Sequence, residues 1–224
     1  MFKFNYFKFY LQLQLLITII AQKGEFVNQK LFVYAKNHSK KTIIFTVLIS
    51  VILNGLINLA GDKLGIPLFL DTIFTAVTAA LFGIIPGILT GLFTNLFQEL
   101  LRGFPLYLYP FAVVNMATGL LVGILVKKGY FKTLFGVFLV IIYTALINSF
   151  LGALIVTIIF GGITNEEVDY IVKVILMTGQ SVFSSTFIAR IFINLVDKGI
   201  AVLIAYLIYV KLKKEKQPKE QTYE

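Results

Sequence analysis

Residues 68–126 read LFLDTIFTAVTAALFGIIPGILTGLFTNLFQELLRGFPLYLYPFAVVNMATGLLVGILV, and this run decides the fold of the chain. Its apolar residues predict three closely linked helices, with polar side chains set into them at helical spacing. A charge or an amide buried in hydrocarbon is costly, so we expect these side chains to face a protein interior or a water-filled pocket. The polar residues that we expect to line a ligand site in this run are Asp71, Asn95, Gln98, Glu99, Arg102 and Asn115.

The composition of the whole chain indicates a membrane protein. Hydrophobic residues make up 58% and charged residues 14% of the chain, and the mean hydropathy is +0.88. Soluble domains are about 45–50% apolar and about 25% charged. The net charge of +9 does not indicate nucleic-acid binding, because the basic residues cluster beside the hydrophobic runs instead of forming one stripe. Because the chain has no cysteine, disulfides and thiolate metal sites are excluded.

The hydrophobic runs predict an all-α, polytopic membrane domain over residues 42–211, with six transmembrane helices. The predicted spans are 42–60, 68–84, 86–102, 109–126, 133–160 and 187–210. The second and third are near the lower limit of length for crossing a bilayer. Residues 171–185 are too polar for an independent span and predict a half-inserted or surface helix before the last one. Gly83, Gly87 and Gly91 recur every four residues, which favours close packing of helix backbones.

The two ends of the chain are basic. Residues 1–41 contain an apolar run, 10–21, that is shorter than the roughly 20 residues a span needs. Three interpretations stay open: an interfacial amphipathic helix, a signal-peptide-like start, and a start codon placed too early. We favour a cytoplasmic or interfacial arm, and we interpret residues 212–224 as a cytoplasmic basic tail.

The positions of lysine and arginine predict that both termini are cytoplasmic. With an even number of spans, one side of the membrane receives the lysines of 40–41, 127–132 and 211–219. The other side receives the acidic loop 165–170, NEEVDY. No other assignment of the spans separates the charges as well.

This orientation brings polar side chains of five spans to one depth, in the outer half of the membrane. The predicted substrate-binding residues are Asn58, Asp71, Asn95, Gln98, Glu99, Asn115, Arg190 and Asn194. On the third span, residues 95, 98, 99 and 102 share one helix face. The loops 61–67 and 103–109, with their glycines and prolines, are expected to close over a solute.

Some of the polar residues have a simpler interpretation. Ser50, Asn54, Asn148 and Ser149 are expected to form interhelical hydrogen bonds. Glu99, Arg102 and Arg190 have an alternative role as a structural ion pair, or as side chains that extend to the interface.

Asp197 and Lys198 are neighbours within the last span. Consecutive residues of a helix point roughly 100° apart. We therefore expect that they do not both face one site, and that one of them pairs elsewhere or with a partner subunit.

The sequence carries no enzyme signature. HExxH and GxSxG are absent, and the single histidine, His38, lies outside the spans, which excludes a histidine-based zinc cluster. We expect no catalytic residue, no cofactor and no metal. No Walker A motif is present, so any ATP-driven step requires another chain.

Three segments carry a resemblance to a known family. They are LGIPLFLDTIFTAVTAALFGIIPGILTGLFTNLF, PFAVVNMATGLLVGILVKKGY and RIFINLVDKGIAVLIAYLIYVKLKK. Because of these three segments, residues 43–214 resemble the substrate-binding S component of energy-coupling factor (ECF) transporters. The resemblance implies a six-helix protein of the cell membrane that captures a vitamin or similar micronutrient from outside. It also implies partners, namely a transmembrane coupling subunit and two cytoplasmic ATPases.

The sequence departs from the family pattern in two places. The small-residue AxxxA motif of the first span is replaced by Ser50 and Gly55, while Ala76 and Ala80 have that spacing on the second span. The chain also has no tryptophan for stacking on a vitamin. Aromatic residues that can substitute near the fourth span are Phe104, Tyr107, Tyr109 and Phe111. The alternatives to transport are a ligand-binding membrane sensor module and, third, a small channel or secondary transporter.

Overall fold

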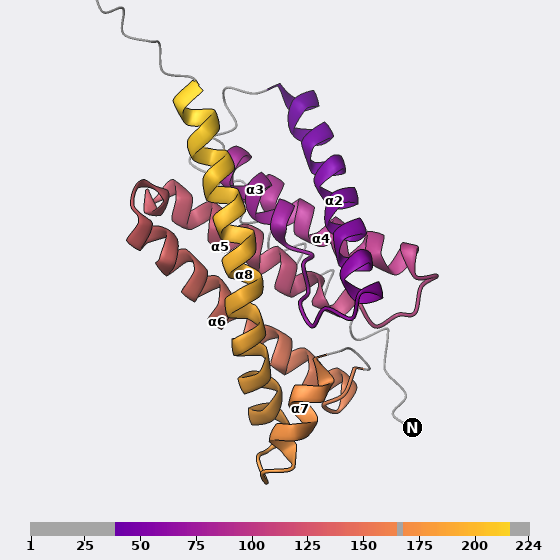
Figure 1. Cartoon of the computed structure of the whole chain (residues 1–224). Helices are drawn as coiled ribbons and strands as arrows, with labels where there is room; N and C mark the ends of the chain where they lie inside the picture. Colours follow the sequence, from indigo (N-terminus) through magenta and orange to yellow (C-terminus); the bar gives the residue numbers. More distant parts are fainter. Residues whose placement is uncertain (1–38, 165–167, 216–224) are drawn as a thin grey trace, which may run out of the picture.

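The computed structural model describes residues 39–164 and 168–215, and every regular element in them is a helix (Figure 1). The helices are α2 (Lys40–Lys63), α3 (Ile73–Phe82), α4 (Ile84–Leu101), η2 (Tyr109–Phe111), α5 (Ala112–Lys127), η3 (Tyr130–Lys132), α6 (Leu134–Phe160), α7 (Asp169–Leu176) and α8 (Val182–Glu215). The predicted all-α class is confirmed. The predicted N-terminal arm lies outside the described residues up to residue 38, as does the C-terminal tail from residue 216.

Five of the described helices are long and apolar enough to cross a membrane: α2, α4, η2 with α5, α6, and α8. The prediction of a helix over all of 68–84 is wrong, because α3 covers only Ile73–Phe82. A helix of 10 residues is about 15 Å long, roughly half the thickness of the hydrocarbon core. The count of six spans is therefore not confirmed.

The segment between α2 and α3 is non-helical because side chains from other helices fix its backbone. Gly65 has a positive φ of 65°, which turns the chain after α2. Further along, Leu70 has φ 51°, and its N–H donates to Asp197 Oδ1 of α8 at 2.7 Å. Asn58 Nδ2 of α2 donates to the carbonyl oxygen of Phe69 at 2.7 Å. These contacts hold Phe69 and Leu70 against the helices of the bundle.

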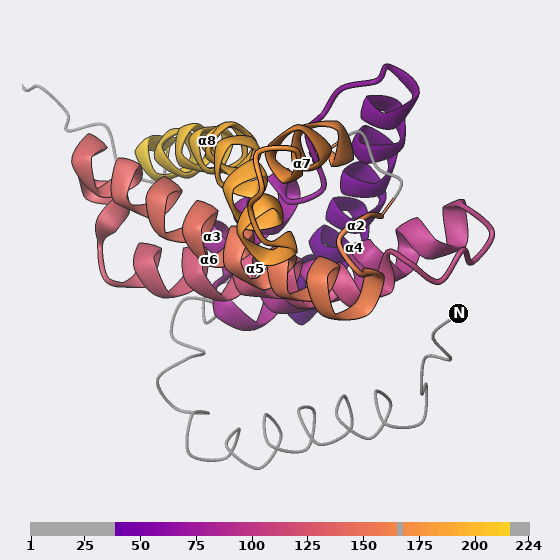
Figure 2. The same cartoon turned by 90° about the horizontal axis from the view of Figure 1, so that it is seen from below.

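The region before the last span also differs from its prediction. The expected half-inserted helix over 171–185 is replaced by the short α7 and by the first turn of α8, which begins at Val182 and not at Phe187. Val168 and Val172 pack against Ala189 and Ile193 of α8. Figure 2 views the bundle from the end that carries α7.

The helices α4 and α5 approach each other at backbone distance through glycines. A Cβ placed on Gly91 would lie 2.5 Å from the main-chain oxygen of Asn115. A Cβ placed on Gly119 would lie 2.3 Å from the carbonyl carbon of Gly87. The packing role predicted for Gly87 and Gly91 is thus confirmed, and it brings α4 and α5 side by side where both carry polar residues.

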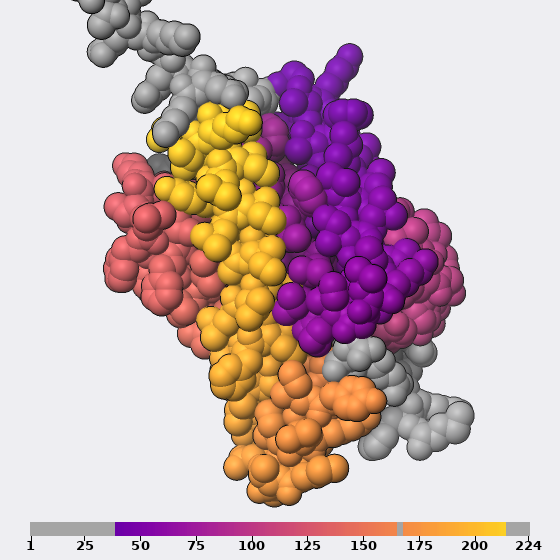
Figure 3. All heavy atoms as spheres, in the orientation of Figure 1, coloured from indigo at the N-terminus to yellow at the C-terminus, as the bar shows by residue number. Residues whose placement is uncertain are grey.

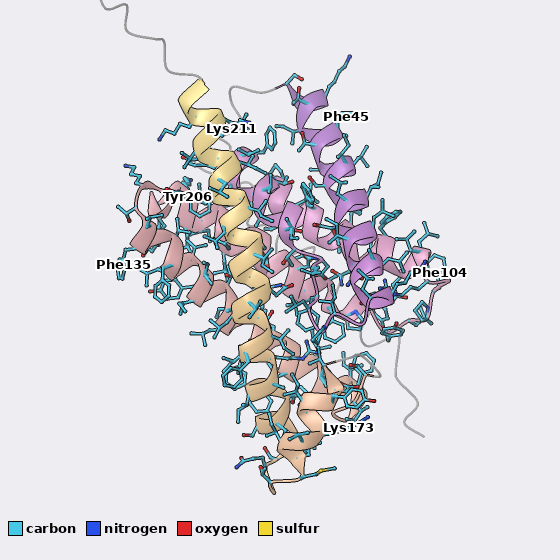
Figure 4. All side chains as sticks on the ribbon, viewed as in Figure 1. Phe45, Phe104, Phe135, Lys173, Tyr206 and Lys211 are labelled. Atoms are coloured by element: carbon cyan, nitrogen blue, oxygen red, sulfur yellow. The ribbon has the colours of Figure 1, made fainter. Side chains whose placement is uncertain are left out.

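The start of α2 and the end of α8 lie at the same end of the molecule, and α7 lies at the opposite end (Figure 1). Lys211 and Lys173 mark these two ends in Figure 4. In Figure 3, α8 extends from one end of the visible face to the other, and α2 lies beside its upper half. This arrangement is compatible with both ends of the membrane domain on one side, although the side that faces the cytoplasm stays a prediction.

Candidate solute-binding site

A cavity of about 40 Å³ lies inside the bundle between α2, α4, α5, α8 and the segment 64–72. It is lined by Asn58, Phe69, Asp71, Thr72, Asn95, Gln98, Leu108, Phe111, Val114, Asn115, Arg190, Asn194 and Lys198. All the predicted substrate-binding residues except Glu99 are in this lining. The structure therefore brings together polar side chains that are more than a hundred positions apart in the sequence.

Three of the amides that line the cavity have a polar atom without a hydrogen-bond partner among the described residues. These atoms are Asn95 Oδ1, Gln98 Nε2 and Asn194 Oδ1. Each of the three side chains is only 1% exposed. A buried polar atom that lacks a partner costs about 1–3 kcal/mol, so three such atoms at one cavity need a ligand or water to satisfy them.

Two other amides of the lining are fully engaged by the protein. Asn58 donates to the Phe69 carbonyl, and its Oδ1 accepts from Arg102 Nη2 at 2.8 Å. Asn115 Nδ2 donates to the main-chain oxygen of Asp71 at 3.0 Å, and its Oδ1 accepts from Thr75 Oγ1 at 2.8 Å. Their contacts are typical of residues that shape the cavity wall, because no hydrogen-bonding atom of either side chain remains unpaired among the described contacts.

Glu99 lies behind the wall and holds the loop between α4 and η2. Its carboxylate accepts from the backbone N–H groups of Leu106 at 3.0 Å, Leu108 at 2.5 Å and Tyr109 at 2.8 Å. Phe104 and Leu106 in this loop have positive φ values of 59° and 62°. The buried carboxylate thus fixes a strained loop conformation.

Asp197 and Lys198 pair with each other, so the expectation that one of them pairs elsewhere is wrong. Lys198 Nζ lies 2.5 Å from Asp197 Oδ2 and donates to Thr72 Oγ1 at 2.9 Å. Neighbouring helix residues point roughly 100° apart. The lysine side chain is long and flexible enough for its ammonium group to reach the Asp197 carboxylate despite this angle. Only Lys198 of the two lines the cavity, whereas Asp197 holds Leu70 through its second oxygen.

Two aromatic rings enclose the guanidinium of Arg190. Its Cζ lies 5.1 Å from the ring centroid of Phe69 and 5.1 Å from that of Phe111. Phe69 also lies 5.9 Å from Lys198 Nζ. Such cation–π contacts contribute about 2 kcal/mol when they are desolvated. Sequence reasoning missed Phe69, because it does not stand out from its apolar neighbours, and it noted Lys198 as a charge in the last span without placing it among the site residues.

A second, outer cavity of about 170 Å³ adjoins the first between the segments 64–72 and 102–108. The two cavities share Asn58, Phe69 and Leu108. Arg102 forms an ion pair with Asp62 at this outer cavity and bonds to Asn58 as well. Of the alternatives for Arg102, the structural ion pair is the one observed, with Asp62 as its partner.

A network of hydrogen bonds joins α2, α3, α4 and α5 next to the cavity. Asn54 Nδ2 donates to Thr75 Oγ1 at 3.1 Å and to Thr94 Oγ1 at 3.2 Å, and Thr75 in turn bonds to Asn115. Ser50 bonds to Thr78 at 2.9 Å. The interhelical role predicted for Ser50 and Asn54 is confirmed, as it is for Asn148, which donates to Thr118 of α5, and for Ser149, which accepts from Asn194 of α8.

The described residues contain no group of three His, Cys, Asp or Glu side chains arranged to hold a metal ion.

In comparisons with known proteins, a family model described as "ECF transporter, substrate-specific component" matches residues 62–209, which is more than half of the chain. No curated protein and no solved structure matches the chain.

Proposed function

The chain belongs to the family of ECF transporter substrate-specific components, and from this premise we propose that it captures a vitamin or similar micronutrient from the extracellular side of the cell membrane. It delivers the solute together with a separate transmembrane coupling subunit and two cytoplasmic ATPases. The observation that carries this proposal is the set of unpaired amide atoms of Asn95, Gln98 and Asn194 at one buried cavity. If these amides had only a structural role, one hydrogen-bonding atom of each would remain buried without a partner, which is uncommon in proteins.

The polar groups that meet the solute are those with capacity to spare, namely Asp71, Asn95, Gln98 and Asn194, with Arg190 beside them. Asn58, Glu99 and Asn115 act indirectly, because they hold the walls and the loop in place. This division assigns different roles to residues that look alike in the sequence.

Access to the inner cavity requires movement of its outer wall. Sites for drug-sized molecules have volumes of roughly 300–1,000 Å³, whereas the inner cavity has about 40 Å³. Phe69 and Leu108, which separate the inner from the outer cavity, belong to the two segments without regular helix. The ion pair between Arg102 and Asp62 joins the end of α4 to the end of α2, next to these two segments, so breaking it allows the segments to part and the solute to pass.

The proposal is tested by isolating the tagged chain from its native membrane and identifying the proteins that accompany it. We expect a membrane coupling subunit and two ATPases, and solute uptake that stops when the ATPases are inactivated. A chain that is isolated without these partners, and that holds a solute without moving it, would instead be a sensor. Flux driven by an ion gradient through the chain alone would identify a channel or secondary transporter.

A further inference from the structure

We infer that the turn between α5 and α6 binds an anionic phospholipid, whose phosphate contacts lysines of the turn and whose acyl chains lie along the first turns of α6. The inference does not depend on the solute, because it concerns the surface of the bundle and not its interior. It is carried by a cluster of lysines, by the packing that fixes the turn, and by an exposed apolar face that begins beside the lysines.

Lysines gather where α5 ends and α6 begins. Lys127 ends α5, Lys128 follows it, Lys132 ends η3, and all three are exposed. Neither Lys128 nor Lys132 forms an ion pair within residues 39–164 and 168–215. The sequence over residues 100–165 contains no acidic residue. The turn therefore carries a concentrated positive charge that an anion can neutralise.

The backbone of this turn is fixed by tight packing. Gly129 has a positive φ of 91°, and its carbonyl oxygen accepts from the N–H of Lys132 at 3.0 Å. The Lys132 side chain folds back across Gly129, because a Cβ on that glycine would lie 3.3 Å from Lys132 Cε. The buried ring of Phe131 lies 5.5 Å from the ring of Tyr206 and 5.6 Å from that of Tyr209, between centroids. Lysines on a fixed turn lose less conformational freedom on binding than lysines on a mobile segment.

Two further groups add positive charge beside the turn. Lys213 Nζ of α8 lies 5.8 Å from the ring centroid of Tyr209, which itself packs on Phe131. The N-terminus of α6 begins directly after Lys132, where Thr133 Oγ1 accepts from the N–H of Gly136 at 3.0 Å. A helix N-terminus carries a partial positive charge, which favours a phosphate nearby.

The apolar part of the surface begins at the start of α6. Leu134, Phe135 and Phe138 are 72%, 69% and 54% exposed, and residues three and four positions apart share one helix face. Figure 4 shows Phe135 at the edge of the molecule, on the same side of α8 as Tyr206. Because α6 is one of the helices that can cross a membrane, this face meets hydrocarbon next to the lysines. A phospholipid offers a phosphate and apolar chains in this order, whereas free phosphate or an acidic protein segment offers charge alone.

The charge of the turn favours an anionic headgroup over a zwitterionic one. Phosphatidylglycerol brings a phosphate without a cation, whereas phosphatidylcholine brings its own cation to the lysines. Each lysine close to an anionic lipid surface strengthens binding by about fivefold. We therefore expect a preference of at least about tenfold for phosphatidylglycerol at this surface.

The test places one tryptophan beside the turn, because the chain has none of its own. The full chain with Phe135→Trp is reconstituted in bilayers of phosphatidylcholine and phosphatidylglycerol, in which one or the other lipid carries brominated chains that quench tryptophan fluorescence. The ratio of the two quenching curves measures the local preference for phosphatidylglycerol. Ile158→Trp is the matched control position, since residue 158 is 76% exposed at the opposite end of the same helix.

We expect the preference at Phe135→Trp and none at Ile158→Trp. Adding Lys128→Gln and Lys132→Gln to Phe135→Trp should lower the preference by about tenfold or more. Adding Lys40→Gln and Lys41→Gln instead removes the same charge from exposed lysines at the start of α2, and should leave the preference unchanged. All the substituted side chains are exposed, and thermal unfolding of the same samples checks that each variant is folded.

The inference is overturned if the two lipids quench Phe135→Trp equally, if the preference survives the loss of Lys128 and Lys132, or if it is as large at Ile158→Trp. Two soluble competitors separate the other sources of negative charge. Glycerol phosphate that abolishes the preference would assign the lysines to a free phosphate, and poly-glutamate that abolishes it would assign them to an acidic protein segment. Either result contradicts a phospholipid site.

Discussion

Replacement of Asn194 by leucine distinguishes a solute-binding amide from a structural one. This amide makes one hydrogen bond to Ser149 and leaves Oδ1 unpaired at 1% exposure. Removing the unpaired atom recovers about 1–3 kcal/mol, and losing the bond costs about 1 kcal/mol. The adjacent cavity of about 40 Å³ has room for the larger side chain. We expect Asn194→Leu to leave the stability unchanged or to raise it by up to about 2 kcal/mol.

Asn54→Leu is the matched comparison, because Asn54 is equally buried and fully bonded. Its Oδ1 accepts from the N–H of Phe74 at 2.9 Å, and its Nδ2 donates to Thr75 and Thr94. Loss of three hydrogen bonds at about 1 kcal/mol each should destabilise the protein by about 3 kcal/mol. For a chain of this size that lowers the Tm by roughly 6–12 °C.

The assay is thermal unfolding of both variants in detergent, followed by circular dichroism after bound solute has been removed. Solute binding is measured on the same samples. We expect the Tm of Asn194→Leu to equal or exceed that of the unchanged chain while its solute binding is lost. A Tm for Asn194→Leu that falls as far as that of Asn54→Leu would refute the reasoning, because Asn194 would then be a structural amide.

Two further predictions concern the frame of the site. Gly91→Ala places a Cβ 2.5 Å from the backbone oxygen of Asn115, so α5 must shift, and we expect a loss of about 1–3 kcal/mol in stability together with weaker solute binding. Gly199→Ala meets nothing within 4 Å and should match the unchanged chain in both measurements; equal effects of the two variants would contradict this packing account. Glu99→Gln weakens the three bonds that hold the loop, so hydrogen exchange at the N–H of Leu106 should rise about ten- to a hundredfold, and unchanged exchange there would rule out this role.

The sequence predicts the helices where long apolar runs meet polar ends, as in α2, α4 and α6, because hydropathy is a local property. It does not predict the break over residues 64–72, since that backbone is held by Asn58 and Asp197 from distant parts of the chain. The same limit applies to the pair of Asp197 and Lys198, whose contact depends on side-chain length and on Thr72.

Most of the candidate lining follows from helical spacing and chain direction. Helical spacing does not predict which of these lining residues have all their hydrogen-bonding atoms paired and which keep an unpaired atom. Asn115 and Asn194 have the same side chain and are equally buried, yet the first is saturated by Asp71 and Thr75, and the second keeps an unpaired oxygen. Only the three-dimensional neighbours of each amide decide which one is available to a solute.

The central claim is that side chains from separate helices form one chamber that holds a solute. Native mass spectrometry of the full chain, purified alone in detergent, tests it most directly. We predict one small-molecule adduct per chain, which is retained in Gly199→Ala and lost in Asn194→Leu. A chain that carries no adduct, or an adduct that persists unchanged in Asn194→Leu, would contradict the claim.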